Sequence, residues 1–338
     1  MSKFKSDKIL LSHGSGGIAS HELITELFLP AFSNPTLDQL NDQALLEFGD
    51  VRIAYTTDSY IIDPIFFPGG DIGKLAVCGT VNDLAMSGAK PLYLSVGFII
   101  EEGFPISDLQ KIIESMRKTA EEAGVKIVTG DTKVANKGYL DKIFINTSGI
   151  GIVDRDINIS GSNAKVGDKV IVSGSIGNHG IAVLSKREGL EFDSPVMSDC
   201  APLNSLVMDM LSVCKDIRCL RDPTRGGLAT TLNELASQSK VGIIIDETKI
   251  PVNESVQGAC ELLGYDPLYI ANEGILVAIV PDDKASVILS KIRENKYGHD
   301  AESIGEVIAE PKNVLLKTAL GTTRIVDMLS GELLPRIC

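Results

Sequence analysis

Four aspartates lie in short segments beside predicted strands, and their side chains could meet around a metal ion. The segments are NDQA with Asp42, TTDSY with Asp58, GTVNDLAMSGAKP with Asp83, and TGDTK with Asp131. Carboxylates from the ends of different strands can converge on Mg²⁺, which prefers oxygen ligands and usually shares them with nucleotide phosphates. One such aspartate is more typical of a turn, but four together favour a metal and nucleotide site.

The last residue, Cys338 in GELLPRIC, is a second group that could react. Chain ends are usually mobile and exposed unless they are tied down, and Pro335 favours an extended arm over a helix. The six cysteines form no dense disulfide framework. Cys214 and Cys219 have no nearby histidine, which argues against structural zinc. We therefore expect an exposed terminal thiol.

Charge and hydropathy exclude several classes of protein. The formal net charge is −13 over 338 residues, which disfavours a protein that neutralises nucleic-acid or membrane phosphates. The apolar run Ile9 to Leu11 is too short for a secretory signal, and no segment approaches the roughly 18 apolar residues of a membrane span. There is no GxxxxGK[ST] motif, and HGSGG (13–17) could either wrap phosphates or form a flexible turn. We expect a soluble, cytoplasmic protein that holds any anionic ligand locally.

The elements that must position these groups follow from periodicity. Alternation of apolar residues predicts a strand at 51–60, and apolar runs predict further strands at 93–100, 125–129 and 142–153. The segment 106–124 places Leu109, Ile112, Ile113, Met116 and Ala120 on one helical face. Ser107 and Gln110 have the spacing of a capping box, and Gly124 marks the end of this helix.

A polar stretch rich in Gly and Asn, from Asp154 to Lys169, divides the chain. Beyond it the pattern predicts strands at 169–174, 242–246 and 275–280 and helices at 202–213, 226–239 and 252–264. A last strand and turn follow Pro311. The sequence thus predicts an α+β protein with an N-terminal domain at 1–154, a C-terminal α+β domain at 155–320 and a tail at 321–338.

The motifs together resemble an ATP-binding family. TTDSY, GTVNDLAMSGAKP, TGDTK, GNHGIA (177–182) and RDPTRGGLATTLNELA (221–236) occur in the order and spacing of the family that contains aminoimidazole ribonucleotide synthetase, selenophosphate synthetase and thiamine-phosphate kinase. The resemblance covers roughly residues 10 to 335. It implies a two-domain PurM-like fold, ATP with Mg²⁺, and a homodimer whose N-terminal sheets join into a barrel.

The terminal PRIC resembles a hydrogenase-maturation branch of this family, whose last cysteine carries the reacting group. That resemblance implies carbamoylation of Cys338 by the carbamoyltransferase HypF, ATP-dependent dehydration to a thiocyanate, and transfer of cyanide to iron on the HypC–HypD complex for [NiFe] hydrogenase. The implied Mg²⁺ ligands are Asp42, Asp58, Asp83 and Asp131. The implied nucleotide contacts are Asp58, Asn82, Asp83, Gly130, Asp131, Thr132 and Lys133.

Elimination of water from the carbamoyl group needs a base, and three residues are candidates. Lys133 could serve if metal and burial lower its pKa, or it could only contact phosphate; Glu273 could be partly desolvated before an apolar strand. His179 in GNHG is more typical of a loop residue with a satisfied hydrogen bond. We predict catalytic roles for Cys338, Lys133 and Glu273.

The same thiol must visit a donor, the ATP site and an acceptor, which predicts a mobile tail. Gly331 would supply flexibility at its base, and Arg336 could lower the pKa of the thiol, pair with phosphate, or be a solvated charge.

Two other functions remain open at this point. A small-molecule kinase or synthetase of the same family would not need PRIC, and a selenophosphate synthetase would be expected to carry a reactive residue in SHGSGG, which has none. A non-catalytic ATP-binding scaffold could use Cys338 as an attachment point, although not as a CaaX lipidation site.

Overall fold

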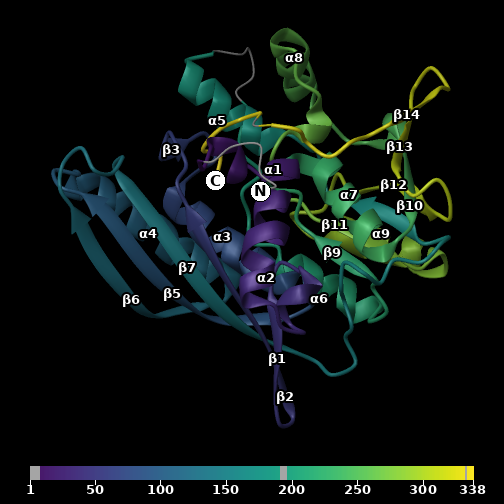
Figure 1. Cartoon of the computed structure of the whole chain (residues 1–338), viewed down its shortest axis with the longest axis horizontal. Helices are drawn as coiled ribbons and strands as arrows, with labels where there is room; N and C mark the ends of the chain where they lie inside the picture. Colours follow the sequence, from purple (N-terminus) through teal and green to yellow (C-terminus); the bar gives the residue numbers. More distant parts are fainter. Residues whose placement is uncertain (1–7, 191–195, 332) are drawn as a thin grey trace.

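The protein folds into two α+β units built around two separate sheets (Figure 1). The computed structural model describes residues 8–190, 196–331 and 333–338. The first sheet has the order β1-β2-β7-β5-β6, and its strands are Ala44–Phe48, Val51–Tyr60, Ile143–Val153, Lys90–Glu101 and Lys126–Ala135. The predicted two-domain α+β organisation is confirmed.

Helices α3 (Ile72–Ala85) and α4 (Ile106–Ala123) cover one face of the first sheet. Strand β7 alternates accordingly, because Ile143, Ile145 and Thr147 are buried while Asn146 and Ile150 are exposed. The other face therefore carries no covering element within the described chain. A short hairpin of β3 (Phe66–Phe67) and β4 (Gly70–Asp71) leads into α3, whose N-cap Asp71 accepts hydrogen bonds from the amides of Gly73 and Lys74.

The second sheet has seven strands in the order β14-β13-β10-β12-β8-β11-β9. They are Thr323–Ile325, Val314–Lys317, Gly242–Asp246, Glu302–Ile308, Lys169–Val172, Val277–Val280 and Cys219–Arg221. Helix α7 (Gly227–Ser239) packs with Val170 and Val277 on one face, and α9 (Asp282–Glu294) packs with Ile171 and Ala278 on the other. The remaining helices of this half are α5 (Asn178–Glu188), α6 (Asn204–Val213) and α8 (Glu254–Leu263).

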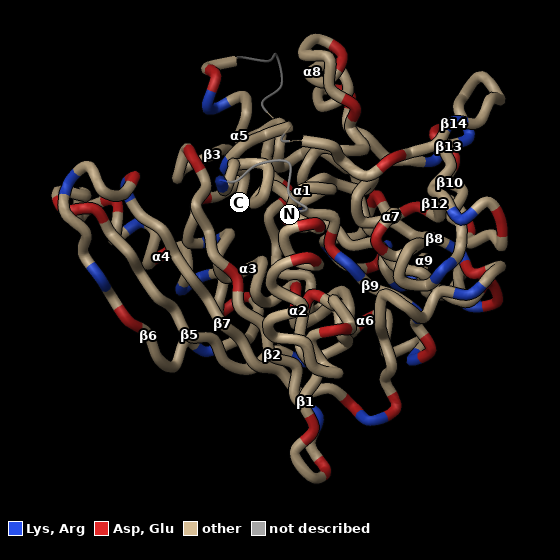
Figure 2. Tube along the Cα trace, in the orientation of Figure 1, with Lys and Arg blue, Asp and Glu red and all other residues tan. Residues whose placement is uncertain are grey.

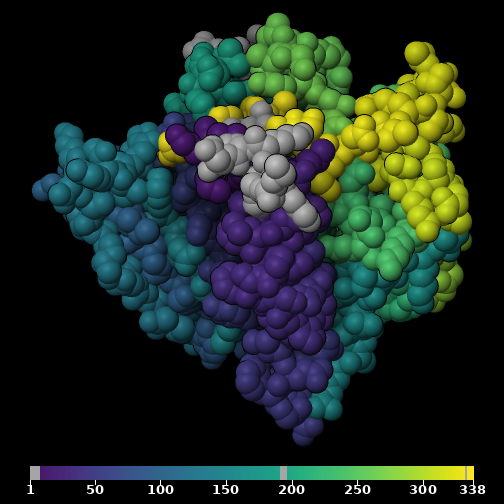
Figure 3. All heavy atoms as spheres, viewed as in Figure 1, coloured from purple at the N-terminus to yellow at the C-terminus, as the bar shows by residue number. Residues whose placement is uncertain are grey.

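Helix α6 joins the two units, since Leu206 and Val207 share a core with Leu84 and Ala85 of α3. The N-terminal segment adds α1 (Gly17–Leu23), a π-helical turn Ile24–Phe28 and α2 (Leu29–Phe32), with 3₁₀ turns at Leu11–His13 and Leu37–Gln39. Figure 3 shows this purple segment running between the first sheet and the C-terminal half. Two further 3₁₀ turns are Glu247–Lys249 and Pro267–Tyr269.

Most predicted elements are present, with three differences. The 106–124 helix is confirmed as α4 with Gly124 at φ 71°, but its N-cap is Pro105 with no side-chain cap, so the capping box is wrong. Strand β6 runs from Lys126 to Ala135, so TGDTK lies inside a strand and not at its end. Several elements were not predicted: helices α1, α2, α3, α5 and α9 and strands β1, β3, β4, β9 and β12.

Within the described ranges, no helix combines the length and the apolar character that crossing a bilayer would require. Figure 2 shows acidic and basic residues interspersed along loops and helix ends, with no single extended basic surface on this view.

Candidate active site

A cavity of about 480 Å³ lies where the N-terminal segment, the first sheet and the C-terminal half meet. Its volume is in the range of ordinary small-molecule sites. Six carboxylates line it, namely Asp42, Asp58, Asp83, Asp222, Glu234 and Glu273. Cys338 lines the same cavity.

Each carboxylate arrives on a different element. Asp42 precedes β1, Asp58 lies near the end of β2, and Asp83 lies in the last turn of α3. Asp222 follows β9, and Glu273 lies in the loop before β11. The Thr56 hydroxyl donates to Asp83 Oδ2 at 2.9 Å, which fixes that carboxylate against β2. The predicted convergence of Asp42, Asp58 and Asp83 is therefore present in one protomer.

Burial and mutual repulsion raise the pKa of these acids. Burial raises the pKa of Asp83 well above its ordinary value, and the charges of Asp222, Asp58 and Asp42 raise it further. The pKa of Asp222 rises to about 7, mainly through burial and then through Asp42. Burial also raises the pKa of Asp42 and of Asp58. A cluster that resists ionisation in this way gains most from a cation placed among its oxygens.

Two arginines place positive charge beside these carboxylates. Arg221 Nε lies 3.2 Å from Asp42 Oδ1, and Arg221 Nη1 lies 2.6 Å from Glu234 Oε2. Arg225 lies at the rim, where Nη1 donates to the Gly14 carbonyl at 2.8 Å. The ionisable groups beside it, Cys338 first and then Asp58 and Glu273, raise the pKa of Arg225 in spite of its desolvation. Arg225 is thus the cation that faces the thiol.

The described residues contain no ready-made metal cage, because no three or more His, Cys, Asp or Glu side chains are grouped closely enough to hold an ion. The donor set is nevertheless all oxygen, acidic and mutually repelling, which suits Mg²⁺. Since Mg²⁺ keeps several waters and usually takes phosphate oxygens as well, these carboxylates fit an ion that arrives with a nucleotide.

The tail is docked with its thiol in the cavity. The amide of Ile61 donates to the Cys338 carbonyl at 3.2 Å, and Leu334 and Ile337 are buried in the core shared by α3 and α5. Burial raises the pKa of the half-buried Cys338 thiol; Arg225 opposes this shift, and Glu273, Asp58 and Asp222 add to it. The docked thiol is therefore held in its neutral form.

His179 holds the tail and does not face the cavity. Its Nε2 lies 2.8 Å from the Ile337 carbonyl and its Nδ1 lies 2.8 Å from Ser198 Oγ. Burial lowers the pKa of His179 to about 4, so the ring is neutral and Nε2–H donates to the carbonyl. Both ring nitrogens have partners, as the sequence favoured, but His179 lies in the first turn of α5 and not in a loop.

Glu273 lines the same cavity as the Cys338 thiol. It is 2% exposed, and its Oε1 has no hydrogen-bond partner. Burial raises its pKa well above the ordinary value, and neighbouring Cys200, Asp222 and Asp58 raise it further. Its backbone amide donates to Asp199 Oδ1 at 2.7 Å, which fixes the loop. An unpartnered, desolvated carboxylate in the cavity has the properties of a general base.

Asn82 lies outside the cavity. It is 0% exposed; its amide donates to the carbonyls of Ala201 and Glu273 and accepts from the amide of Leu203. All its donors and acceptors are used at the junction of the two units. The structure therefore gives Asn82 a place in the domain junction, and its predicted contact with nucleotide stays a prediction.

The structure does not bring the TGDTK residues into this cavity. Gly130, Asp131, Thr132 and Lys133 lie on the exposed edge strand β6. Lys133 Nζ pairs with Asp131 Oδ2 at 2.5 Å, and both side chains are about two-thirds exposed. Within this chain, Asp131 does not line the cavity with the other aspartates, and Lys133 does not line it with the thiol.

The Arg336 side chain does not lie where a contact with the thiol or with phosphate in the cavity would place it. Its guanidinium pairs with Asp141 and with the Ile61 carbonyl, away from the carboxylate cluster. Arg225 takes the place beside Cys338 instead. Sequence reasoning assigned no role to Asp222, Arg225 or Asp199. The motif RDPTRGG contains the first two and was the available signal.

Comparisons with known proteins identify the family of this chain. Residues 40–153 match the N-terminal domain, and residues 165–317 the C-terminal domain, of the AIR synthase related proteins. Carbamoyl dehydratase HypE of Cupriavidus necator is 54% identical over 336 residues, covering 99% of this chain and 96% of that protein.

Two solved structures are similar over most of the chain. The crystal structure of a HypE–HypF complex has a TM-score of 0.87 at 55% identity, covering 91% of this chain and 99% of the other. HypE in complex with ATP has a TM-score of 0.83 at 52% identity, covering 98% and 100%. The docked thiol, the desolvated Glu273 and the carboxylate cluster lie within this shared fold. The chain therefore belongs to the HypE carbamoyl dehydratases, enzymes of hydrogenase maturation within the AIR synthase related proteins.

Proposed function

We propose that this protein uses ATP to dehydrate a carbamoyl group carried on Cys338, which leaves a thiocyanate that supplies cyanide for the iron of [NiFe] hydrogenase. The observation that carries the proposal is that Cys338 lies in one cavity with Glu273 and four aspartates. A thiol delivered into a phosphate-binding site is expected only if the group it carries reacts there.

The chemistry balances with ATP as the only co-substrate. The carbamoyl oxygen attacks the γ-phosphorus, and the bond from that phosphorus to the bridging oxygen breaks to release ADP. The C–O bond then breaks with its electron pair going to phosphate, while the nitrogen loses two protons and forms the triple bond. Phosphorylation converts the carbamoyl oxygen from a poor leaving group into a good one. Catalysis of the phosphoryl transfer itself depends largely on positioning and electrostatic stabilisation.

Asp42, Asp58, Asp83 and Asp222 would hold Mg²⁺, which supplies neutralisation of phosphate charge when bound. Their proximity and raised pKa values support this assignment. Glu273 is the proposed base, because its free Oε1 is desolvated and shares the cavity with the thiol. The docked thiol and Glu273 belong to one protomer, so this part of the chemistry needs no second chain.

We propose a homodimer that joins the N-terminal sheets. The uncovered face of the first sheet carries Tyr55, Ile150 and Tyr93, which are neighbours across β2, β7 and β5 and 37–43% exposed. An apolar patch of this kind marks an interface. Gly130, Asp131, Thr132 and Lys133, on the adjacent edge strand, would contribute to a nucleotide site near that interface, with Asp131 as a metal ligand and Lys133 as a phosphate contact or a second base.

The proposed partners are HypF as carbamoyl donor and the HypC–HypD complex as cyanide acceptor, in the cytoplasm. A complex of HypE with HypF is among the similar structures. Because one thiol serves three sites, the tail must alternate between the docked position and a mobile one.

Intact-protein mass spectrometry tests the proposal. The wild type and Cys338→Ala are incubated with HypF, carbamoyl phosphate and Mg–ATP. We expect a carbamoyl adduct on the wild type only, followed by loss of one water. ATP consumption without any adduct on Cys338 would instead indicate a small-molecule kinase, and ATP binding without turnover would indicate a scaffold.

A further inference from the structure

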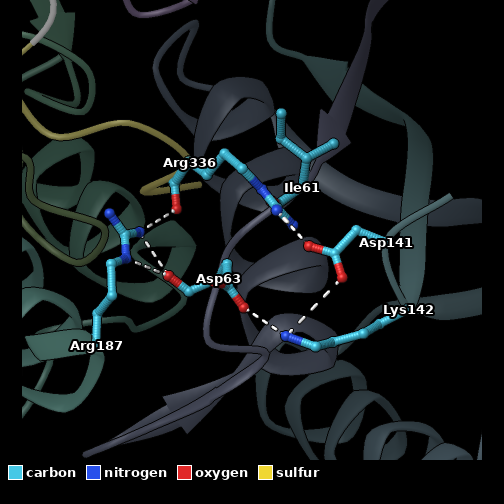
Figure 4. Close-up of polar contacts among 6 residues, drawn as sticks. All are labelled: Ile61, Asp63, Asp141, Lys142, Arg187 and Arg336. Atoms are coloured by element: carbon cyan, nitrogen blue, oxygen red, sulfur yellow. Dashed lines mark hydrogen bonds and ion pairs between the residues drawn. The ribbon is translucent and has the colours of Figure 1, made fainter. Parts of the chain in front are cut away.

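One arginine joins the docked tail to the segment that follows β2, residues 61–63. Arg187, near the end of α5, donates through Nε to the Asp63 carbonyl at 2.8 Å and through Nη2 to the Arg336 carbonyl at 2.8 Å (Figure 4). The first acceptor belongs to the first domain and the second belongs to the tail. Arg187 is half-buried, so solvent competes only partly for these bonds.

The tail residues also pair directly with the backbone of the segment 61–63. The amide of Ile61 donates to the Cys338 carbonyl and the amide of Asp63 donates to the Arg336 carbonyl, both at 3.2 Å, in the order of an antiparallel bridge. The Arg336 side chain reaches back, with Nε donating to the Ile61 carbonyl at 2.8 Å and Nη1 pairing with Asp141. The Arg336 carbonyl thus accepts from both Arg187 and Asp63, two residues before the thiol.

The docked arrangement also carries unfavourable features. Arg336 has φ 49°, in the left-handed region that a side chain rarely adopts, and its buried Nη2 has no hydrogen-bond partner. Both are relieved when the tail leaves. Arg187 also bonds to Asp63 of the first domain, so we expect its side chain to stay oriented toward this position when the tail leaves.

We propose that Arg187 is a positioning residue: by bridging the carbonyls of Asp63 and Arg336 it holds Cys338 in the cavity for dehydration and opposes its release to the donor. The role of this docking in dehydration rests on the proposed function, but the docking itself can be measured without it. Arg187 does not touch the thiol, and the strain in Arg336 keeps the docked state reversible.

Alkylation of the thiol measures docking without ATP, HypF or turnover. All six cysteines lie in the described ranges, and the other five are buried. Iodoacetamide labelling of the full-length protein, followed by intact and peptide mass spectrometry, therefore reports the undocked fraction at Cys338. Arg187→Ala should raise the labelling rate roughly tenfold, which corresponds to about 1.4 kcal/mol of docking free energy. Arg187→Lys, which keeps the charge but cannot span both carbonyls, should raise it less.

Two further variants keep the test decisive. Lys186→Ala, at an exposed neighbour on α5, is the matched control and should label like the wild type. Asp141→Asn removes the partner of the Arg336 guanidinium from an exposed loop position and should raise labelling severalfold even if Arg187→Ala fails to fold.

Wild-type labelling rates in Arg187→Ala and Asp141→Asn, or an equal rise in Lys186→Ala, would overturn the proposal. A second experiment, with HypF and Mg–ATP, connects docking to function. Arg187→Ala should accept the carbamoyl group from HypF at least as fast as the wild type. It should form thiocyanate severalfold more slowly. If the wild type forms no adduct at all, the proposed function fails while the labelling rates still decide whether Arg187 holds the tail.

Discussion

The side chain of Asn82 donates to the backbone carbonyl of Glu273 at 3.3 Å, across the junction between the two domains. The same amide donates to the Ala201 carbonyl at 3.1 Å and accepts from the Leu203 amide at 2.8 Å. A residue of the N-terminal domain thereby fixes the loop that carries the proposed base. The position of Glu273 depends on how the domains are joined as well as on its own strand.

Asn82→Ala should destabilise the protein by about 3 kcal/mol, because it leaves the buried Ala201 carbonyl and Leu203 amide unpaired and removes one of the two donors to the Glu273 carbonyl. Urea denaturation measures the change. Dehydration should fall as well, since the Glu273 loop loses its support. Asn204→Ala, which removes a single partly buried hydrogen bond to the Ala123 carbonyl in the same region, is the comparison and should lose about 1 kcal/mol or less.

Glu273→Gln should separate stability from catalysis. The raised pKa of Glu273 means that its ionisation destabilises the fold as pH rises above the ordinary range of a glutamate. The neutral amide should therefore match or exceed the wild-type stability at pH 8. Thiocyanate formation should fall by about 10² or more, as expected for loss of a general base. An active Glu273→Gln enzyme would remove Glu273 from that role.

Asp83→Asn should stabilise the protein without metal and abolish its response to Mg–ATP. Asp222, Asp58 and Asp42 repel the Asp83 charge, so an amide relieves that repulsion but removes a metal ligand. Thermal unfolding with and without Mg–ATP makes the comparison. The wild type should gain several degrees on adding Mg–ATP, and a comparable gain in Asp83→Asn would contradict the assignment.

The low pKa of His179 predicts that the folded protein loses stability in acid. Burial lowers its pKa from 6.5 to about 4, so the unfolded chain takes up the proton first as pH falls. The neutral ring contributes its stability above pH 6.5, and this contribution is lost between pH 6.5 and 4. At pH 5 the loss amounts to about 2 kcal/mol. In urea denaturation at pH 7.5 and 5, His179→Gln should show a correspondingly smaller loss than the wild type; equal losses would refute the attribution.

Ile150→Glu should convert the proposed homodimer to monomers. Ile150 lies between Tyr55 and Tyr93 on the uncovered face of the first sheet, and a charge there cannot be buried without a partner. Light scattering after size-exclusion chromatography measures the mass. Glu47→Gln, at an exposed position on β1, is a control that should leave the mass unchanged. A monomeric wild type would contradict the dimer outright.

Local structure was largely determined by the sequence. The 3.6-residue spacing of apolar residues in α4 and the alternation in β2 are properties of short segments, and both elements form where predicted. The aspartate-bearing motifs and the terminal thiol were visible for the same reason. The prediction of β6 stopped too early because its exposed residues 129–133 lack an apolar pattern.

Which residues meet was decided only by the tertiary structure. Asp222 and Arg225 enter the cavity because β9 ends there, although their motif was visible in the sequence. Asn82 leaves it because α3 turns that side chain toward Ala201 and Glu273, while Asp83, one residue on, faces the carboxylates. Adjacent positions on a helix point about 100° apart, so a motif alone cannot say which of two neighbours reaches a ligand. Arg336 likewise pairs with Asp141 instead of the thiol because residues 336–338 bridge to 61–63, a contact between segments about 275 residues apart in the chain.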